Sequence, residues 1–114
     1  MFMGTWKLIS LKQGAKEIIV SPEDSIQRLK YITKSHFVWI QYLKNTRVIR
    51  NSTGGTYTFK GNDYIENHEF VGFGSMDFLN KIYAFKVYII DNKMYLSGLL
   101  STGIYIDEIW QRLD

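Results

Sequence analysis

The 114-residue sequence contains no cysteine, which excludes disulfide bonds, thiolate nucleophiles and metal sites built on cysteine. Its single proline and nine glycines argue against a disordered chain. No apolar stretch is long enough to cross a bilayer, and no signal peptide precedes the first strand-like residues. We therefore expect no membrane span. We expect a cytoplasmic location for the chain as it stands, and a periplasmic or otherwise exported one if a leader has been removed.

Neither positive nor negative charge is concentrated in one part of the sequence. The 14 Lys and Arg and the 11 Asp and Glu give a net charge of +3, spread along the chain without a run. Such dispersion is typical of a solvated surface and predicts no basic patch for nucleic acid or membranes. Two histidines without cysteine do not predict a zinc site, and no cofactor motif is present. We expect no nucleic acid, metal or cofactor as partner.

Aromatic residues are the abundant class, at 16% of the chain, and they favour strands. The length suits one domain spanning residues 1–114, with a core of its own. Alternating patterns separated by turn residues predict eight to ten short antiparallel strands and almost no helix. We therefore predict an all-β fold, a small up-and-down β-barrel, with a sandwich as the alternative. The strand-like segments are 4–10, 17–20, 26–32, 36–43, 56–60, 63–70 and three within 81–114.

Two turns in the first half decide which side chains point inward. A three-residue loop at 33–35 is predicted to gather Leu29, Tyr31, Phe37 and Trp39 on one face, whereas a two-residue loop would shift this register. The segment 21–24 begins like a helix and predicts a single helical turn. Arg47–Ser52 is ambiguous, and the paired glycines at 54–55 predict a bulge or a sharp bend.

A hairpin turn at Gly61-Asn62 is predicted to pair Phe59 with Tyr64 and Tyr57 with Glu66. The aromatic face of this hairpin must be the inner one, because the opposite face is polar and charged. The predicted inner face therefore comprises Tyr57, Phe59, Tyr64, Glu66, His68 and Phe70. Residues 71–75 are rich in glycine, and residues 76–80 that follow them predict a short turn or a lid.

The last third predicts a three-stranded meander with turns at Asp91-Asn92 and at residues 101–103. These turns pair Val87 with Leu96 and Met94 with Trp110, which places Glu108, Trp110 and Arg112 on the inner face. A two-residue second loop would instead turn Tyr105, Ile109 and Leu113 inward and leave the charged side chains in water. Both registers remain open at this stage.

The opening Gly4-Thr5-Trp6 resembles the G-x-W signature of lipocalins and the wider calycin group. Nearly the whole chain resembles a small bacterial lipocalin-like domain family of unassigned function, through HFVWIQY, GGTYTF, YIENHEF and the closing EIWQR. The resemblance implies a calycin-type barrel around a cavity for a small, mostly apolar molecule. It also implies structural roles for Gly4 and Trp6, with Arg112 packed across Trp6 at the barrel base. The chain departs from secreted lipocalins in its short length and its lack of cysteines and a long helix.

Charged side chains on the predicted inner face require partners, because isolated charges are costly to bury. We expect Arg112 to pair with Glu108 or Glu66, with His68 nearby. Aromatic side chains are expected to line the remaining space. We therefore predict non-catalytic binding of a small hydrophobic or amphipathic ligand. The predicted ligand-binding residues are Trp39, Tyr57, Tyr64, Glu66, His68, Phe85, Glu108, Trp110 and Arg112.

Several other functions compete with this prediction. The runner-up is a structural or protein-interaction domain with a filled interior, in which residues 37–42 form an exposed edge. An enzyme using Glu66 with Glu108 or His68, and a haem barrel using His68 or His36, lack supporting motifs. A single-strand nucleic-acid barrel would need exposed aromatics, whereas these sort inward. The oligomeric state stays open, a homodimer included.

Overall fold

The computed structural model describes residues 1–14, 16–19, 25–100 and 103–114, which form one antiparallel sheet and a 3-10 helix. The predicted helical turn at 21–24 lies outside the described residues. None of the helical structure described could cross a membrane. The elements are β1 (Gly4–Gln13), β2 (Lys16–Ile19), β3 (Ile26–Ile32), β4 (His36–Leu43), β5 (Ile49–Lys60), β6 (Asp63–Val71), η1 (Phe73–Phe78), β7 (Ile82–Ile90), β8 (Lys93–Leu99) and β9 (Tyr105–Arg112).

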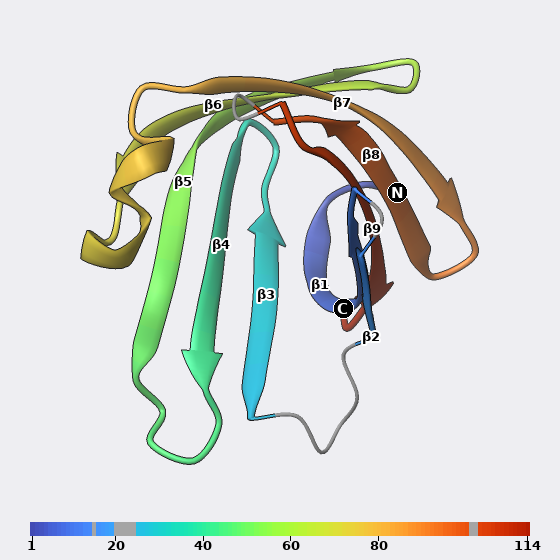
Figure 1. Cartoon of the computed structure of the whole chain (residues 1–114). Helices are drawn as coiled ribbons and strands as arrows, with labels where there is room; N and C mark the ends of the chain where they lie inside the picture. The colour runs from blue at the N-terminus through green and yellow to red at the C-terminus, as the bar shows by residue number, and fades with distance from the viewer. Residues whose placement is uncertain (15, 20–24, 101–102) are drawn as a thin grey trace.

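The sheet closes into an up-and-down barrel, as predicted (Figure 1). Strands β3 to β9 each pair with the next, and β1 closes the circle by pairing with β3 on one side and β9 on the other. Strand β2 extends the sheet by pairing with the second half of β1. Because β4 pairs with both β3 and β5, the predicted exposed edge at 37–42 is wrong.

Strand β1 contains a bulge that lets both of its halves contribute to the core. Its register against β9 shifts between Leu8 and Ser10. Without that shift, alternate side chains would point inward at even positions only. The bulge changes the parity, so that Trp6 and Leu8 are buried before it and Leu11 after it.

The predicted Gly61-Asn62 hairpin is confirmed in its register, with Phe59 opposite Tyr64. Of the ambiguous segment before it, residues 49–52 belong to β5, whereas Arg47 and Val48 precede the strand. The predicted bulge at the paired glycines is also confirmed: Gly54 lies opposite Phe70 and Gly55 opposite His68. A Cβ on Gly55 would lie 1.9 Å from the Asn67 carbonyl oxygen, so this approach requires glycine. The same bulge corrects one prediction, because beyond it Phe70 turns outward and is exposed.

The predicted register between β3 and β4 is wrong by one residue. Thr33 and His36 pair across a two-residue turn, with the Thr33 amide donating to the His36 carbonyl at 2.9 Å. Ile32 therefore lies opposite Phe37, and Lys30 lies opposite Trp39. Leu29 and Tyr31, predicted to face inward, occupy the alternate positions, and Tyr31 is exposed.

The closing meander follows the predicted register throughout. Val87 lies opposite Leu96, and Met94 lies opposite Trp110. Glu108 and Trp110 are buried, which excludes the alternative with Tyr105 and Ile109 inside. Residues 101 and 102 of the predicted loop lie outside the described part of the chain.

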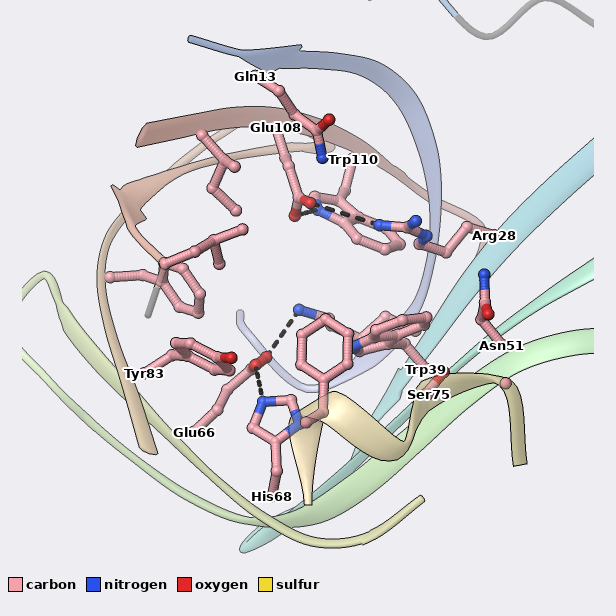
Figure 2. Close-up of a pocket in the computed structure, with 16 residues that line it drawn as sticks. Gln13, Arg28, Trp39, Asn51, Glu66, His68, Ser75, Tyr83, Glu108 and Trp110 are labelled. Atoms are coloured by element: carbon pink, nitrogen blue, oxygen red, sulfur yellow. Dashed lines mark hydrogen bonds and ion pairs between the residues drawn. The ribbon is translucent and has the colours of Figure 1, made fainter. Parts of the chain in front are cut away.

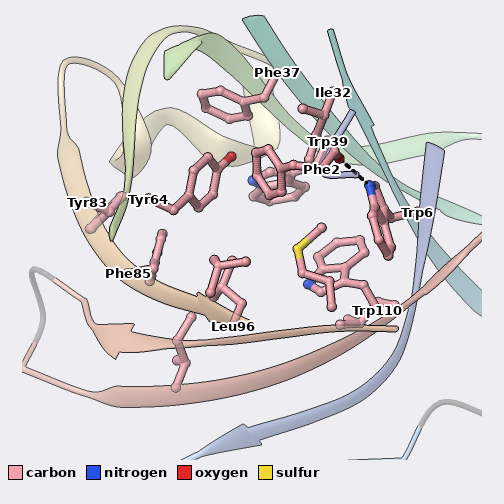
Figure 3. Close-up of a cluster of buried hydrophobic side chains, with 14 of the residues drawn as sticks. Phe2, Trp6, Ile32, Phe37, Trp39, Tyr64, Tyr83, Phe85, Leu96 and Trp110 are labelled. Atoms are coloured by element: carbon pink, nitrogen blue, oxygen red, sulfur yellow. Dashed lines mark hydrogen bonds between the residues drawn. The ribbon is translucent and has the colours of Figure 1, made fainter. Parts of the chain in front are cut away.

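Apolar side chains fill one end of the barrel (Figure 3). Phe2 enters from the N-terminal segment, and its ring lies 4.4 Å from that of Phe59 and 4.9 Å from that of Tyr64. Trp6 is fully buried, and its indole N–H donates to the Phe2 carbonyl at 3.0 Å. This end therefore consists of packed core, and unfilled space remains towards the other end.

Candidate functional site

A cavity of about 300 Å³ lies at the end of the barrel away from Phe2. Its lining comes from β1, β3, β4, β5, β6, β7 and β9, from η1, and from Leu100 just beyond β8. Exposed residues Gln13 and Gly74 belong to the lining, so the cavity reaches the surface there. Its apolar wall is formed mainly by Trp39, Phe78, Tyr83, Phe85, Ile106 and Trp110, and its ionisable groups are Arg28, Lys30, Glu66, His68 and Glu108.

The Glu66 network comprises Glu66, Lys30, Tyr64 and His68. Glu66, Lys30 and His68 form one side of the cavity, where Figure 2 shows Glu66 and His68. Oε2 of Glu66 accepts a hydrogen bond from Lys30 Nζ at 2.8 Å and one from the Tyr64 hydroxyl at 2.6 Å. Oε1 accepts from His68 Nε2 at 2.9 Å. Three donors therefore satisfy a carboxylate whose residue is only 2% exposed.

The network keeps Glu66 ionised. Burial alone would raise its pKa, but the positive charge of Lys30 and the hydrogen bond from His68 outweigh burial and lower the pKa to about 2. Burial and the adjacent Glu66 carboxylate raise the pKa of the Tyr64 hydroxyl well above its ordinary value. At neutral pH Tyr64 therefore donates to Glu66, and Lys30 provides the compensating positive charge.

His68 is held at both ring nitrogens. Nε2 contacts Glu66, and Nδ1 lies 2.7 Å from the hydroxyl of buried Thr53. Thr53, His68 and Glu66 are hydrogen-bonded in series, in the order of a nucleophile, a base and an acid. Thr53, however, is not part of the cavity lining. With both nitrogens engaged, His68 also has no nitrogen left for a haem iron, and His36 is exposed at a turn.

A second charged group, the Glu108 pair of Glu108 and Arg28, lies across the cavity from Glu66 (Figure 2). Arg28 Nη1 lies 3.6 Å from Oε2 of Glu108, and Trp110 Nε1 donates to Oε1 at 2.9 Å. Arg28 is anchored by Nε and Nη2, which donate to the Gln41 side-chain oxygen at 3.0 and 2.7 Å. Burial lowers the pKa of Arg28 from its ordinary value, against the opposing effect of Glu108.

Helix η1 lies beside β5 and β6 (Figure 1), and its residues Gly74, Ser75 and Phe78 belong to the cavity lining. Its buried Ser75 hydroxyl accepts from the Ser52 amide at 3.0 Å, which fixes the helix to β5. Phe78 points into the cavity, its ring 5.6 Å from that of Trp39 and 5.4 Å from that of His68. The predicted turn or lid is therefore an ordered part of the cavity wall.

The structure brings most of the sequence-predicted site residues together. Those that line the cavity are Trp39, Glu66, His68, Phe85, Glu108 and Trp110. Tyr64 lies behind this wall, where it bonds Glu66, and Tyr57 lies at the filled end beside Phe2. Arg112 also lies away from the cavity, so its expected pairing with Glu66 or Glu108 is wrong.

Arg112 instead takes the position that the lipocalin resemblance implies. Its guanidinium carbon lies 4.2 Å from the centroid of the Trp6 ring, and Nη1 donates to the Met3 carbonyl at 2.8 Å. Gly4 has a φ of +143°, and a Cβ there would lie 2.7 Å from Arg112 Nη1 and 2.3 Å from the Asp114 carbonyl oxygen. Glycine at this position therefore leaves room for Arg112 to reach across Trp6.

The cations of the site, Arg28 and Lys30, were not predicted from the sequence. Both occupy alternate positions on β3 and face inward only in the two-residue-turn register. The available signal was the inward position of Glu66 and Glu108, since two buried carboxylates require two buried cations. That requirement favours the register that turns Lys30 inward.

The described part of the chain contains no cluster of three His, Asp or Glu able to hold a metal ion. Its cavity offers hydrogen-bonding groups, two ion pairs and aromatic walls, an arrangement that suits reversible binding. Among the described residues that line the cavity, no nucleophilic side chain is hydrogen-bonded to a base.

No family model matches the chain, and no curated protein matches it significantly. Among solved structures, an uncharacterised protein from Bacteroides eggerthii DSM 20697 matches with a TM-score of 0.70 and 17% identity, over 98% of this chain and 99% of that one. A variant of the fluorescent protein UnaG matches with a TM-score of 0.49 and 12% identity, over 99% of this chain and 96% of that one. The first likeness supports the fold; the second is too weak to carry an argument.

Proposed function

We propose that this barrel binds a small amphipathic molecule in the cavity between the Glu66 network and the Glu108 pair, without chemical conversion of the ligand. The observation that carries the proposal is the cavity of about 300 Å³ in a barrel whose other end is packed. A volume of this size lies at the lower end of the range of small-molecule sites. The ligand is therefore small, and its apolar body contacts the aromatic wall.

The lining favours an amphipathic ligand over a purely apolar one. Aromatic walls provide apolar surface, whereas Arg28 and Glu108 place polar atoms in the same lining. A purely apolar ligand would cover these polar atoms without replacing their contacts with water, at a cost of about 1–3 kcal/mol for each group left unpaired. A ligand with one polar end avoids that cost.

Fluorescence titration tests this proposal, because Trp39 and Trp110 lie in the cavity wall. We expect small aromatic compounds and anilinonaphthalene dyes to quench the tryptophan signal saturably. Ile106→Phe, which adds volume inside the cavity, should abolish the response. Ile109→Phe on the opposite face of the same strand is the matched control and should leave the response unchanged.

Thermal melts of both variants separate a blocked cavity from an unfolded protein. Saturable quenching that survives in folded Ile106→Phe would contradict the proposed location. The absence of binding by any small compound would favour the structural or interaction domain, whose expected sign is a change in size on a gel-filtration column.

A further inference from the structure

The two carboxylates that face the cavity differ in how completely they are satisfied. Glu66 accepts three hydrogen bonds of 2.6–2.9 Å. Glu108, only 7% exposed, accepts one hydrogen bond from the described residues, that of Trp110 to Oε1. An ionised carboxylate offers about four acceptor positions, and buried polar groups normally fill them. Glu108 therefore has acceptor capacity left on its cavity side.

The contact between Glu108 and Arg28 does not fill that capacity. The distance of 3.6 Å between Arg28 Nη1 and Glu108 Oε2 is an ion-pair distance but too long for a hydrogen bond. The other two guanidinium nitrogens are committed to Gln41, and the guanidinium lies 4.6 Å from the Trp39 ring centroid, so Arg28 is held in place. Within the described part of the chain, Glu108 Oε2 is thus an unused hydrogen-bond acceptor, and Arg28 Nη1 beside it is an unused donor.

The charges around the cavity are already balanced. Lys30 compensates Glu66, and Arg28 compensates Glu108. A ligand carboxylate placed against Arg28 would also lie close to Glu108, and a ligand cation at Glu108 would lie close to Arg28. Like charges in a buried site repel each other strongly. The charge balance therefore favours a neutral ligand.

We infer that Glu108 and Arg28 recognise a neutral group in which an N–H lies beside a carbonyl oxygen, as in a cyclic amide. This inference rests on the proposed function and specifies its ligand class. Glu108 Oε2 accepts from the ligand N–H, and Arg28 Nη1 donates to the ligand carbonyl. The flat body of the ligand lies against the rings of Trp39, Phe78 and Tyr83.

Carbostyril, a bicyclic aromatic cyclic amide, is the test probe, and N-methylcarbostyril lacks its N–H. Naphthalene has the aromatic body alone, and octanoate has a carboxylate. We expect the wild-type protein to bind carbostyril about tenfold or more tightly than N-methylcarbostyril, the usual size of a hydrogen bond to a charged group. Isothermal titration of the four compounds measures this preference.

Glu108→Leu should reduce the preference for the N–H compound over its N-methyl analogue to less than about threefold. Asp107→Leu removes the neighbouring, exposed carboxylate on the outer face of β9 and should keep the preference. A melting curve establishes that each variant is folded. If Glu108→Leu fails to fold, the two carbostyrils compared on the wild-type protein still decide the question.

The outcomes separate this inference from the proposal on which it rests. Equal binding of both carbostyrils, or tighter binding of octanoate, would overturn the ligand class while leaving cavity binding in place. Binding of naphthalene without either carbostyril would do the same. If none of the four compounds binds and the dyes also fail, the proposed function falls together with the ligand class.

Discussion

Lys30 on β3 is buried, with only 2% of its surface exposed, yet its side chain carries a charge. Three contacts make this placement stable: the ion pair with Glu66 at 2.8 Å, and the ring faces of Trp110 and Tyr64 at 4.9 and 5.4 Å. A buried cation beside a carboxylate and aromatic faces loses water but gains charge and quadrupole interactions. The stability of the barrel interior therefore depends on keeping Lys30 and Glu66 together.

Replacing Lys30 by methionine should destabilise the protein by about 3–5 kcal/mol, because Glu66 would remain buried without its cation. Urea denaturation at neutral pH measures the change. Lys60→Met, at an exposed position, is the matched control and should change stability by about 0.5 kcal/mol or less. Similar effects of the two substitutions would show that the Lys30 charge has no structural importance.

Glu66 should also make stability depend on pH in the acid range. Its pKa is about 2 in the folded protein and near its ordinary value of 4.5 in the unfolded chain. A lowered pKa adds stability that is present above the unfolded value and is lost as pH falls from about 4.5 towards 2. The expected loss is about 3 kcal/mol.

Denaturation curves at several pH values test this dependence. Glu66→Gln cannot titrate, so its stability should change less between pH 5 and pH 2.5 than that of the wild type. Parallel curves for the two proteins would assign the acid sensitivity to other carboxylates.

At this scale the sequence predicts the acids better than their partners. Glu66, His68 and Glu108 follow from strand alternation next to tight turns with clear signals. Lys30 follows only from the register across Lys34-Ser35, where apolar Leu29 and Tyr31 favour the wrong face. Its partner Glu66 lies 36 residues away and becomes adjacent only when the barrel closes.

At the scale of elements, η1 forms part of the cavity wall, and its two phenylalanines lie in opposite surroundings. Phe78 points inward between Trp39 and His68, whereas Phe73 is 97% exposed. The helix follows Gly72, where a Cβ would lie 2.2 Å from the Ser52 hydroxyl oxygen. Glycine therefore lets the chain approach β5 closely enough to place Phe78 in the wall.

Phe78→Ala should increase the release rate of a bound dye by about tenfold, because the variant loses the ring that narrows the cavity. Stopped-flow fluorescence measures the rate after dilution or competition. Phe73→Ala removes an equally large ring from the same helix but not from the cavity, and should leave the rate unchanged. Equal rates in both variants would exclude η1 from a role in access.

Tight turns are easier to predict from the sequence than bulges. The hairpins at Gly61-Asn62 and Asp91-Asn92 are specified by local turn chemistry, and their registers are as predicted. Bulges are harder to place, because the extra residue is defined by the neighbouring strand. The bulge at the paired glycines was expected, yet its effect on the direction of Phe70 depends on β6.

At the scale of the whole molecule, the pairing of β1 with β9 turns the sheet into a barrel. Arg112 reinforces this closure near the chain ends, where it covers Trp6 and donates to the carbonyls of Met1 and Met3. The Thr5 amide donates to the Asp114 carbonyl at 2.9 Å beside it. One side chain thus ties the N-terminal segment to the last strand.

Arg112→Ala should lower stability by about 1–3 kcal/mol, through loss of the contact with Trp6 and of hydrogen bonds to the backbone. Arg112→Lys keeps the charge but loses the planar guanidinium, so its stability should lie between those of the wild type and the alanine variant. Thermal and urea unfolding measure both. A lysine variant as stable as the wild type would reduce the role of Arg112 to its charge alone.

The architecture as a whole follows from the sequence, because alternation in many short segments permits few folds other than a barrel or a sandwich. The position of the cavity does not. Which end of the barrel is filled depends on Phe2, which lies outside the strands and contacts Phe59 and Tyr64 far along the chain. Its entry into the interior is a consequence of tertiary packing.

Because Phe2 and its neighbouring rings fill one end of the barrel, the cavity does not run through the barrel from end to end. If the proposed binding holds, a ligand would leave on the open side of the barrel by which it entered. Excess competitor would then prevent its rebinding without accelerating its departure, and exchange would be set by the dissociation rate of the bound ligand.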